Sequence, residues 1–183
     1  MRRPPHGLRV ERFRPREADV LRRLYDAYLE EIVGFGASYR RGGDGRWEYR
    51  PPGGKWGPDH LAYWVAKGDE HAVLMFRLGR TVVGFAMIGL GPAVWMPPAT
   101  DACLAEFFVV PTARRRGVGE AAARRVLRRG RGRWEISEVA GNAPAIAFWR
   151  LTIGRLTRGR FEEVAVRGGL VQRFTMPGAR TRG

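Results

Sequence analysis

The sequence has few of the features that mark secreted, metal-binding or membrane-spanning proteins. Its 183 residues include one cysteine, Cys103, so an internal disulfide is excluded and the cytoplasm is the expected compartment. No apolar run reaches the ~18 residues that a membrane-spanning helix needs, and the basic start lacks the apolar stretch of a signal peptide. The histidines His6, His60 and His71 are isolated, so no metal site is predicted.

Lysine is also scarce: the chain has two lysines and 31 arginines. Its net charge is +15. Such an excess of positive charge attracts polyanions. Nine of the arginines lie between Arg114 and Arg133, where they either form a surface for phosphates or RNA or lie on a solvated helix face. No strand carries a basic and aromatic RNA-binding motif, so any binding of nucleic acid is expected to be weak and non-specific.

Length and a hydrophobic content of 44% fit one domain over residues 1–183, with an ordered core over 7–177 and a frayed tail over 179–183. Patterns typical of strands and helices alternate along the chain, which predicts an α/β (α+β) fold. Strands are expected over residues 8–13, 72–78, 81–88, 104–110, 134–139, 161–167 and 170–175. Helices are expected over residues 16–32, 59–67, 120–127 and 143–150.

The most informative motif lies between a predicted strand and a predicted helix. It consists of Arg114, Arg115, Arg116, Gly117, Val118 and Gly119, and Glu120 opens the helix that follows. Glycine lets the backbone approach a ligand closely, and the first N–H groups of a helix have no partner within the helix. The helix dipole also places partial positive charge there. The segment therefore predicts a phosphate or pyrophosphate site.

A second motif follows the next strand, where Asn142 is a suitable N-cap and Pro144 lies in the first turn of a helix. Phe148 and Trp149 form an aromatic pair within that helix. Together, the Arg-x-x-Gly-x-Gly spacing and Asn142-x-Pro144-Ala145-x-x-Phe148-Trp149 resemble the two signatures of the GNAT superfamily of N-acetyltransferases. The resemblance is specific over residues 73–163, where it is closest to a bacterial subgroup of predicted acetyltransferases with no assigned substrate.

The resemblance implies a GNAT-type mixed, mostly antiparallel central sheet of six to seven strands, flanked by about four helices. It also implies acetyl-CoA as co-substrate, with its pyrophosphate on the loop from Arg114 to Gly119 and the adjoining Glu120. In this family the fourth strand bulges and its backbone binds the pantetheine arm. By position, that role is expected of Phe108, Val109 and Val110. Asn142 is expected either to contact the pantetheine or acyl region or to serve as a helix cap alone.

The segment 36–58 combines glycine and proline with Tyr39, Trp47, Tyr49 and Trp56. It has too much glycine for regular structure and too many aromatic residues for a plain linker, so a functional loop is expected, with a disordered loop as the alternative. In GNAT folds the corresponding region borders the acceptor site. By that analogy, the segment is expected to cover a substrate.

Acetyl transfer to an amine needs a base, and buried carboxylates in the central strands are the candidates. Glu106 lies in the middle of an apolar strand, where it is expected to act as base or amine anchor, or else to pair with an arginine. Glu138 is a second candidate, with a strand-end surface position as the alternative. Glu135 lies on the face opposite Glu138, so at most one of these two can line the site.

The proton donor is where the sequence departs from the family pattern. Many relatives have a tyrosine where Trp149 stands, and an indole N–H can donate a hydrogen bond without giving up its proton. Trp149 is therefore expected to be a wall or a hydrogen-bond donor. The proton for the leaving thiolate is then expected to come from water or from Tyr63, unless the thiolate leaves unassisted.

Three functions are compatible with the sequence. The first is an acetyl-CoA-dependent N-acetyltransferase that acts on a primary amine of a small molecule or protein, by direct attack in a ternary complex. The second is an acyltransferase associated with RNA or aminoacyl-tRNA, and the third is a non-catalytic acyl-CoA-binding module. The oligomeric state stays open, a homodimer included, and no membrane partner is expected.

Overall fold

The computed structural model describes residues 5, 7–66, 68–91 and 96–176. Its main feature is a seven-stranded sheet of order β1-β5-β6-β7-β8-β10-β9, in which neighbours are antiparallel except for the parallel pair β7–β8. The strands are β1 (Leu8–Arg12), β5 (His71–Leu78), β6 (Thr81–Leu90), β7 (Ala102–Val109), β8 (Gly132–Val139), β9 (Phe161–Val166) and β10 (Gly169–Met176). The helices are α1 (Ala18–Val33), α2 (Leu61–Val65), α3 (Val118–Leu127) and α4 (Ala143–Thr157). The expected sheet and helices are therefore confirmed.

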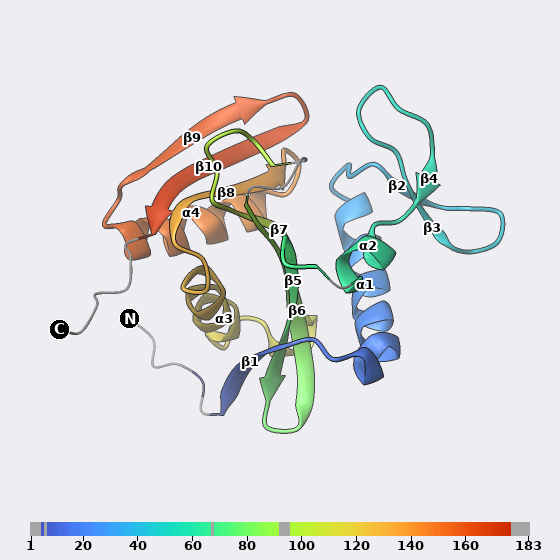
Figure 1. Cartoon of the computed structure of the whole chain (residues 1–183), viewed down its shortest axis with the longest axis horizontal. Helices are drawn as coiled ribbons and strands as arrows, with labels where there is room; N and C mark the ends of the chain where they lie inside the picture. The colour runs from blue at the N-terminus through green and yellow to red at the C-terminus, as the bar shows by residue number, and fades with distance from the viewer. Residues whose placement is uncertain (1–4, 6, 67, 92–95, 177–183) are drawn as a thin grey trace.

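Helices cover both faces of the sheet, with α1 and α2 on one side and α3 and α4 on the other (Figure 1). In α1, Leu21, Tyr25 and Leu29 recur at helical spacing, and all three are fully buried against the sheet. On the opposite face, small residues of α3 and the side chains of Trp149 and Ile153 in α4 complete a second core. The central strands β6 and β7 therefore contribute side chains to both cores.

The segment 36–58 differs from the irregular loop that was expected. It forms a small sheet of β2 (Tyr39–Arg41), β3 (Trp47–Tyr49) and β4 (Gly57–Pro58), which lies beyond α1 and α2 in Figure 1. Tyr39 and Trp47 are buried in the same core as α1, so the aromatic residues stabilise short strands that glycine-rich turns join. Arg40 also bonds Glu48 across the strands at 2.7 Å.

Two other expectations concern the ends of elements. The helix expected over residues 59–67 is confined to Leu61–Val65, and Asp59 accepts a hydrogen bond from the N–H of Leu61 at 2.9 Å. Ala66 is already extended, which ends the helix early. The tail expected over residues 179–183 lies outside the described residues.

Candidate functional site

The strands β7 and β8 separate halfway along their length. Three parallel pairs join them, from Ala102 with Trp134 to Leu104 with Ile136, and then pairing ends. At the same place β7 bulges against β6, because Met87 lies opposite Glu106 whereas Ile88 lies opposite Leu104, so that Ala105 is extra. We call the unpaired stretch, β7 residues 105–109 and β8 residues 137–139, the strand opening.

The strand opening exposes backbone groups of β7. The N–H of Val110 donates to Val83 at 2.9 Å, so by alternation the backbone of Phe107 and Val109 points away from β6 and into the opening. The carbonyl of Val109 accepts a hydrogen bond from Arg114 Nε at 2.7 Å. Of the backbone expected to bind the pantetheine, Val109 faces the opening, whereas Phe108 and Val110 face β6. The backbone of Phe107, which was not predicted, also faces the opening.

The predicted phosphate loop joins β7 to α3. Its backbone turns through two left-handed residues, Arg115 with φ 60° and Gly117 with φ 78°. Gly117 is the N-cap of α3, so Val118 and Gly119 carry N–H groups that have no acceptor within the helix. Among the described residues, the two chain neighbours aside, a Cβ on Gly117 would have no atom closer than Pro5 Cδ at 4.0 Å, which leaves space against this backbone. Such a concave run of N–H groups favours anions.

The glycine at position 119 has a different role. A Cβ there would lie 3.3 Å from the ring of Phe148 in α4, so this glycine permits close packing of α3 on α4. Glu120, in the same turn, pairs with Arg155 of α4 at 2.9 Å. These two residues therefore hold the helices together, and the side chain of Glu120 is not directed to the phosphate loop.

The side chain of Arg114 also turns away from the loop. Its guanidinium forms two hydrogen bonds to Glu31 of α1, at 2.9 and 2.6 Å, and lies over the ring of Phe108 at 5.4 Å. Arg114 thereby ties the end of α1 to the phosphate loop. Only the backbone of Arg114 therefore remains available to a phosphate site, next to Arg115 and Arg116 in the loop.

Glu106 lies directly after the bulge, on the face of β7 that α1 covers. Tyr28 of α1 donates its hydroxyl hydrogen to Glu106 Oε2, and both residues are half-buried. Burial of the carboxyl raises the pKa of Glu106 from 4.5 to about 7, whereas the bond from Tyr28 lowers it. Among the described residues no arginine pairs with Glu106, so the expected alternative of an ion pair is wrong.

Tyrosines surround this carboxyl, a feature that was not predicted from the sequence. Burial and the charge of Glu106 raise the pKa values of Tyr25, Tyr28, Tyr39 and Tyr49. The rings of Tyr25 and Tyr28 lie 6.0 Å apart, and those of Tyr39 and Tyr49 lie 5.0 Å apart. A signal was present, because Tyr25 and Tyr28 share the buried stripe of α1 that points at the central strands.

Glu138 is buried rather than at the surface, with 7% of the residue exposed. It lies on the α4 face of β8, because it shares that face with Ile136 and pairs with Leu170 of β10. Neither carboxyl oxygen has a hydrogen-bond partner among the described residues. Burial and, second, the nearby charge of Glu163 raise the pKa of Glu138 to about 8. Glu106 and Glu138 therefore lie on opposite faces of the sheet and do not share one site.

We expect Glu138→Gln to stabilise the protein in alkaline solution. The folded-state pKa of about 8 exceeds the ordinary 4.5, so the folded protein holds a proton that the unfolded chain releases between these pH values. The free energy of unfolding of the natural protein should therefore fall across that window, and the variant should lack this fall and gain a few kcal/mol by pH 8. Urea unfolding at pH 5 and pH 8 measures it.

Glu163→Gln is the matched control, because Glu163 is paired with Arg150 and Gln172 and its pKa is lowered to about 2. That variant should lose stability at pH 5, where Glu163 is paired with Arg150 and Gln172 and Glu138 carries no charge. An equal free energy of unfolding for Glu138→Gln and the natural protein at pH 8 would show that Glu138 is ionised at no cost.

Two further predicted residues lie in α4 and at its N-cap. Trp149 is 5% exposed, and its ring lies 5.1 Å from that of Phe107 at the strand opening, which fits a wall. Asn142 caps α4, because its Oδ1 accepts a hydrogen bond from the N–H of Ala145 at 3.2 Å. The cap uses the oxygen of this amide and leaves its NH₂ group to serve as a donor.

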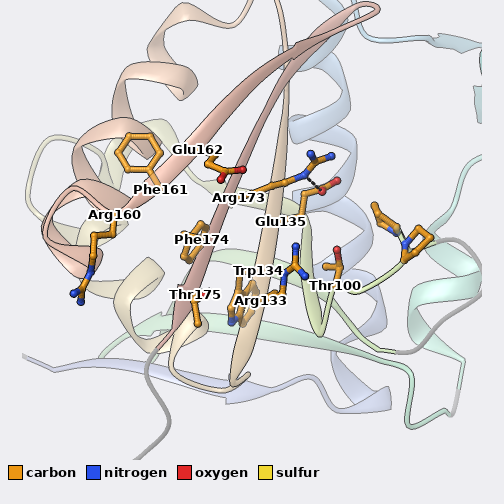
Figure 2. A pocket seen from close by; sticks show the side chains of 12 residues that line it. Thr100, Arg133, Trp134, Glu135, Arg160, Phe161, Glu162, Arg173, Phe174 and Thr175 are labelled. Atoms are coloured by element: carbon orange, nitrogen blue, oxygen red, sulfur yellow. Dashed lines mark hydrogen bonds and ion pairs between the residues drawn. The ribbon is translucent and has the colours of Figure 1, made fainter.

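A cavity of about 930 Å³ lies at the other end of β8. Figure 2 shows Arg133 and Glu135 of β8 and Arg173 of β10 in its lining, with Arg173 paired to Glu135 at 2.8 Å. None of the predicted coenzyme-binding or catalytic residues lines it. The strand opening is therefore a separate place on the molecule.

Metal-binding and membrane-spanning features are both missing from the part of the chain that the structure describes. No group of three or more His, Cys, Asp or Glu side chains gathers there in a way that could hold a metal ion. Within the same ranges, no helix has the length and apolar character needed to cross a membrane.

The sequence matches one protein family. Residues 44–153 match the model of the Acetyltransferase (GNAT) family, which is more than half of the chain. These residues include β6, β7, the phosphate loop, α3, β8 and most of α4. No curated protein matches the sequence at a significant level.

Solved structures share the fold. An acetyltransferase from Thermus thermophilus has a TM-score of 0.65 at 18% identity, over 95% of this chain and 100% of its own. The ribosomal-protein-S18-alanine N-acetyltransferase of Escherichia coli has a TM-score of 0.58 at 13% identity, over 96% and 98%. A Bacillus anthracis protein in complex with acetyl coenzyme A has a TM-score of 0.54 at 11% identity, over 92% and 99%.

Proposed function

This chain belongs to the GNAT acetyltransferase family, whose co-substrate is acetyl-CoA, and we propose that it acetylates a primary amine of a small molecule. The amine attacks the thioester directly in a ternary complex. The observation that carries the proposal is the position of Glu106, which lies beside the bulge of β7 in the stretch that is not paired with β8. A carboxyl whose pKa is raised to about 7 is suited to take a proton from an amine near neutral pH.

The coenzyme is proposed to bind on the α3 side of the opening. Its pyrophosphate would accept hydrogen bonds from backbone N–H groups of the loop from Arg114 to Gly119, where the left-handed Gly117 leaves space. Its pantetheine arm would pair with the backbone of Phe107 and Val109 as an added strand, in competition with Arg114 Nε for the Val109 carbonyl. Trp149 would form a wall, and the amide NH₂ group of Asn142 would donate to the arm.

The acceptor is proposed to approach from the α1 side, where Glu106 lies. Tyr28, Tyr39 and Tyr49 bring aromatic rings to this side, and rings around a carboxylate favour a cationic amine through cation–π attraction. The small sheet β2–β3–β4 supplies two of these rings, which supports an acceptor small enough to fit beneath it. The E. coli protein named above acts, by its name, on a ribosomal protein, so a protein amine is the alternative that the test must include.

The proposal is tested by thiol release from acetyl-CoA with a library of small amines and with peptides that carry free N-termini. We expect release that depends on the amine, with small cationic amines faster than peptides. Thiol release with peptides but not with small amines would show that the acceptor is a protein amine. Coenzyme binding without any amine-dependent release would favour the non-catalytic module.

Trp149→Phe should retain most of the activity. The indole N–H is not a source of protons at this step, and a phenyl ring keeps the contact with Phe107. Rates of thiol release at saturating acetyl-CoA measure the effect. A loss beyond about a hundredfold, the scale of removing a transition-state hydrogen bond, would show that the indole N–H takes part in catalysis.

The remaining expectations stay proposals: one domain, a cytoplasmic location, and weak, non-specific binding of nucleic acid. The arginine-rich segment is partly used for structure, which supports the last of these. Arg129 donates to the carbonyl of Val10 at 2.7 Å, and Arg125 donates to Ala121 within α3 at 3.2 Å. The charge on this surface is therefore not wholly available to a polyanion.

A further inference from the structure

Acetyl transfer leaves a coenzyme thiolate that needs a proton, and the residue on α4 at the usual place of the donor is Trp149. The strand opening holds another hydroxyl that could supply it. Tyr28 reaches Glu106 in the opening from α1, on the opposite face of the sheet from Trp149, and is half-buried there in the core on the α1 side. Its hydroxyl is hydrogen-bonded to Glu106, the group proposed as base. Base and hydroxyl are therefore joined by one hydrogen bond.

We propose that Tyr28 is the general acid, and that it is recharged by Glu106 within the same turnover. This inference rests on the proposed function, because it assigns a role in that reaction. The pair would return the proton taken from the amine to the sulfur of the coenzyme. A proton relay of this kind needs no tyrosine on α4.

The step balances without another reactant. Glu106 takes a proton from the attacking amine, the N–C bond forms, and the C–S bond breaks with its electron pair left on sulfur. Tyr28 gives its hydroxyl proton to that sulfur, and the protonated Glu106 passes its own proton to the tyrosine oxygen. The products are the N-acetyl amine and the free thiol, and both side chains return to their starting state.

The environment of Tyr28 favours a relay over a separate acid. Burial and the negative charge of Glu106 raise the pKa of Tyr28, so a free tyrosinate is unfavourable there. Once Glu106 has taken the proton of the amine, its charge is gone and it can donate to the tyrosine oxygen. If the two transfers are coupled, no tyrosinate accumulates, and the cost of burying that charge is avoided.

Two other candidate proton donors, Glu138 and Tyr63, lie away from Glu106. Glu138, which is protonated near neutral pH, lies on the α4 face and near Arg150 and Glu163 rather than near Glu106. Tyr63 is 41% exposed on α2, and its ring lies 4.8 Å from His71 at the start of β5, two strands away from β7. Tyr28, by contrast, is hydrogen-bonded directly to Glu106.

The test compares Tyr28→Phe with the natural protein on two acetyl donors, acetyl-CoA and an acetyl-CoA analogue whose thiol is more acidic. A thiolate that leaves easily needs less help from an acid. We expect Tyr28→Phe to lose about a hundredfold in kcat with acetyl-CoA, and much less with the analogue. Tyr25→Phe, one turn earlier in α1 and fully buried, is the matched control and should lose only a few-fold with both donors.

A second variant guards against misfolding. Glu106→Asp keeps a carboxylate but shortens its reach to Tyr28, so the same dependence on the donor is expected. An equal loss with both donors in Tyr28→Phe would overturn the relay and leave Tyr28 as a positioning residue. The donor-dependent loss in Tyr63→Phe instead of Tyr28→Phe would also overturn it. Absence of amine-dependent turnover in the natural protein would refute the proposed function itself.

Discussion

Glu106→Gln is expected to lower kcat/KM for the acceptor amine about a thousandfold, within the range of general base catalysis. Glutamine has the shape of glutamate and still accepts the hydrogen bond of Tyr28, but its amide cannot take a proton. The structure around the strand opening should therefore be kept while the chemistry is lost. Steady-state rates at saturating acetyl-CoA, with the best amine from the library, give the measurement.

The raised pKa of Glu106 also sets how kcat/KM and stability change with pH. The active form of Glu106 is the carboxylate, and its pKa is raised to about 7, so kcat/KM should rise with pH and level off above 7. The same raised pKa means that the folded protein loses stability as pH increases from 4.5 to 7, so the variant should melt no lower than the natural protein at pH 8. Activity and stability should therefore change in opposite directions.

The matched control is Glu135→Gln, which removes a carboxylate that is paired with Arg173 on the neighbouring strand. Its kcat/KM should stay close to that of the natural protein. If Glu106→Gln lost less than about tenfold, another group would be the base.

Gly117→Glu is expected to abolish the rise in melting temperature that coenzyme A causes. A ligand that binds the folded protein at a hundred times its Kd stabilises it by ~2.7 kcal/mol, so the rise in the natural protein should be several degrees. Glutamate would place a side chain and a negative charge against the loop that is proposed to hold the pyrophosphate. Differential scanning fluorimetry with and without coenzyme A measures the loss.

Gly117→Ala separates charge from strain. Both substitutions place a side chain on a backbone with φ 78°, which costs ~1 kcal/mol or more, so both variants should melt lower without ligand. Only glutamate adds a repelling charge, and Gly117→Ala should keep part of the rise with coenzyme A. A full rise in Gly117→Glu would place the pyrophosphate elsewhere.

Local signals made much of this fold predictable. The strand–turn–helix around Gly117 and the cap at Asn142 depend on residues within a few positions of each other, and both stand in the structure as expected. The order of strands and helices followed from hydrophobic periodicity. The family resemblance then supplied the topology, including the bulge in β7, which no local pattern dictates.

The features that the sequence did not predict are formed by contacts between residues far apart in the chain. Tyr28 meets Glu106 across 78 positions, so no spacing rule links them. The position of Glu138 near the end of a strand predicted a surface residue, but packing on the α4 side of the sheet buries it. The strands of segment 36–58 are two or three residues long, too short for an alternation to show, and they form because Tyr39 and Trp47 pack into the core. The roles of the predicted coenzyme-binding residues stay predictions.

The central claim is direct acetyl transfer from acetyl-CoA to an amine. The most direct measurement is mass spectrometry of a running reaction, in which the amine product, the free thiol and the intact protein are quantified together. Direct transfer should give one N-acetyl amine for each thiol released and no acetyl group on the protein at any time. Thiol release without acetylated amine, or an acetylated protein that forms and then decays during turnover, would contradict it.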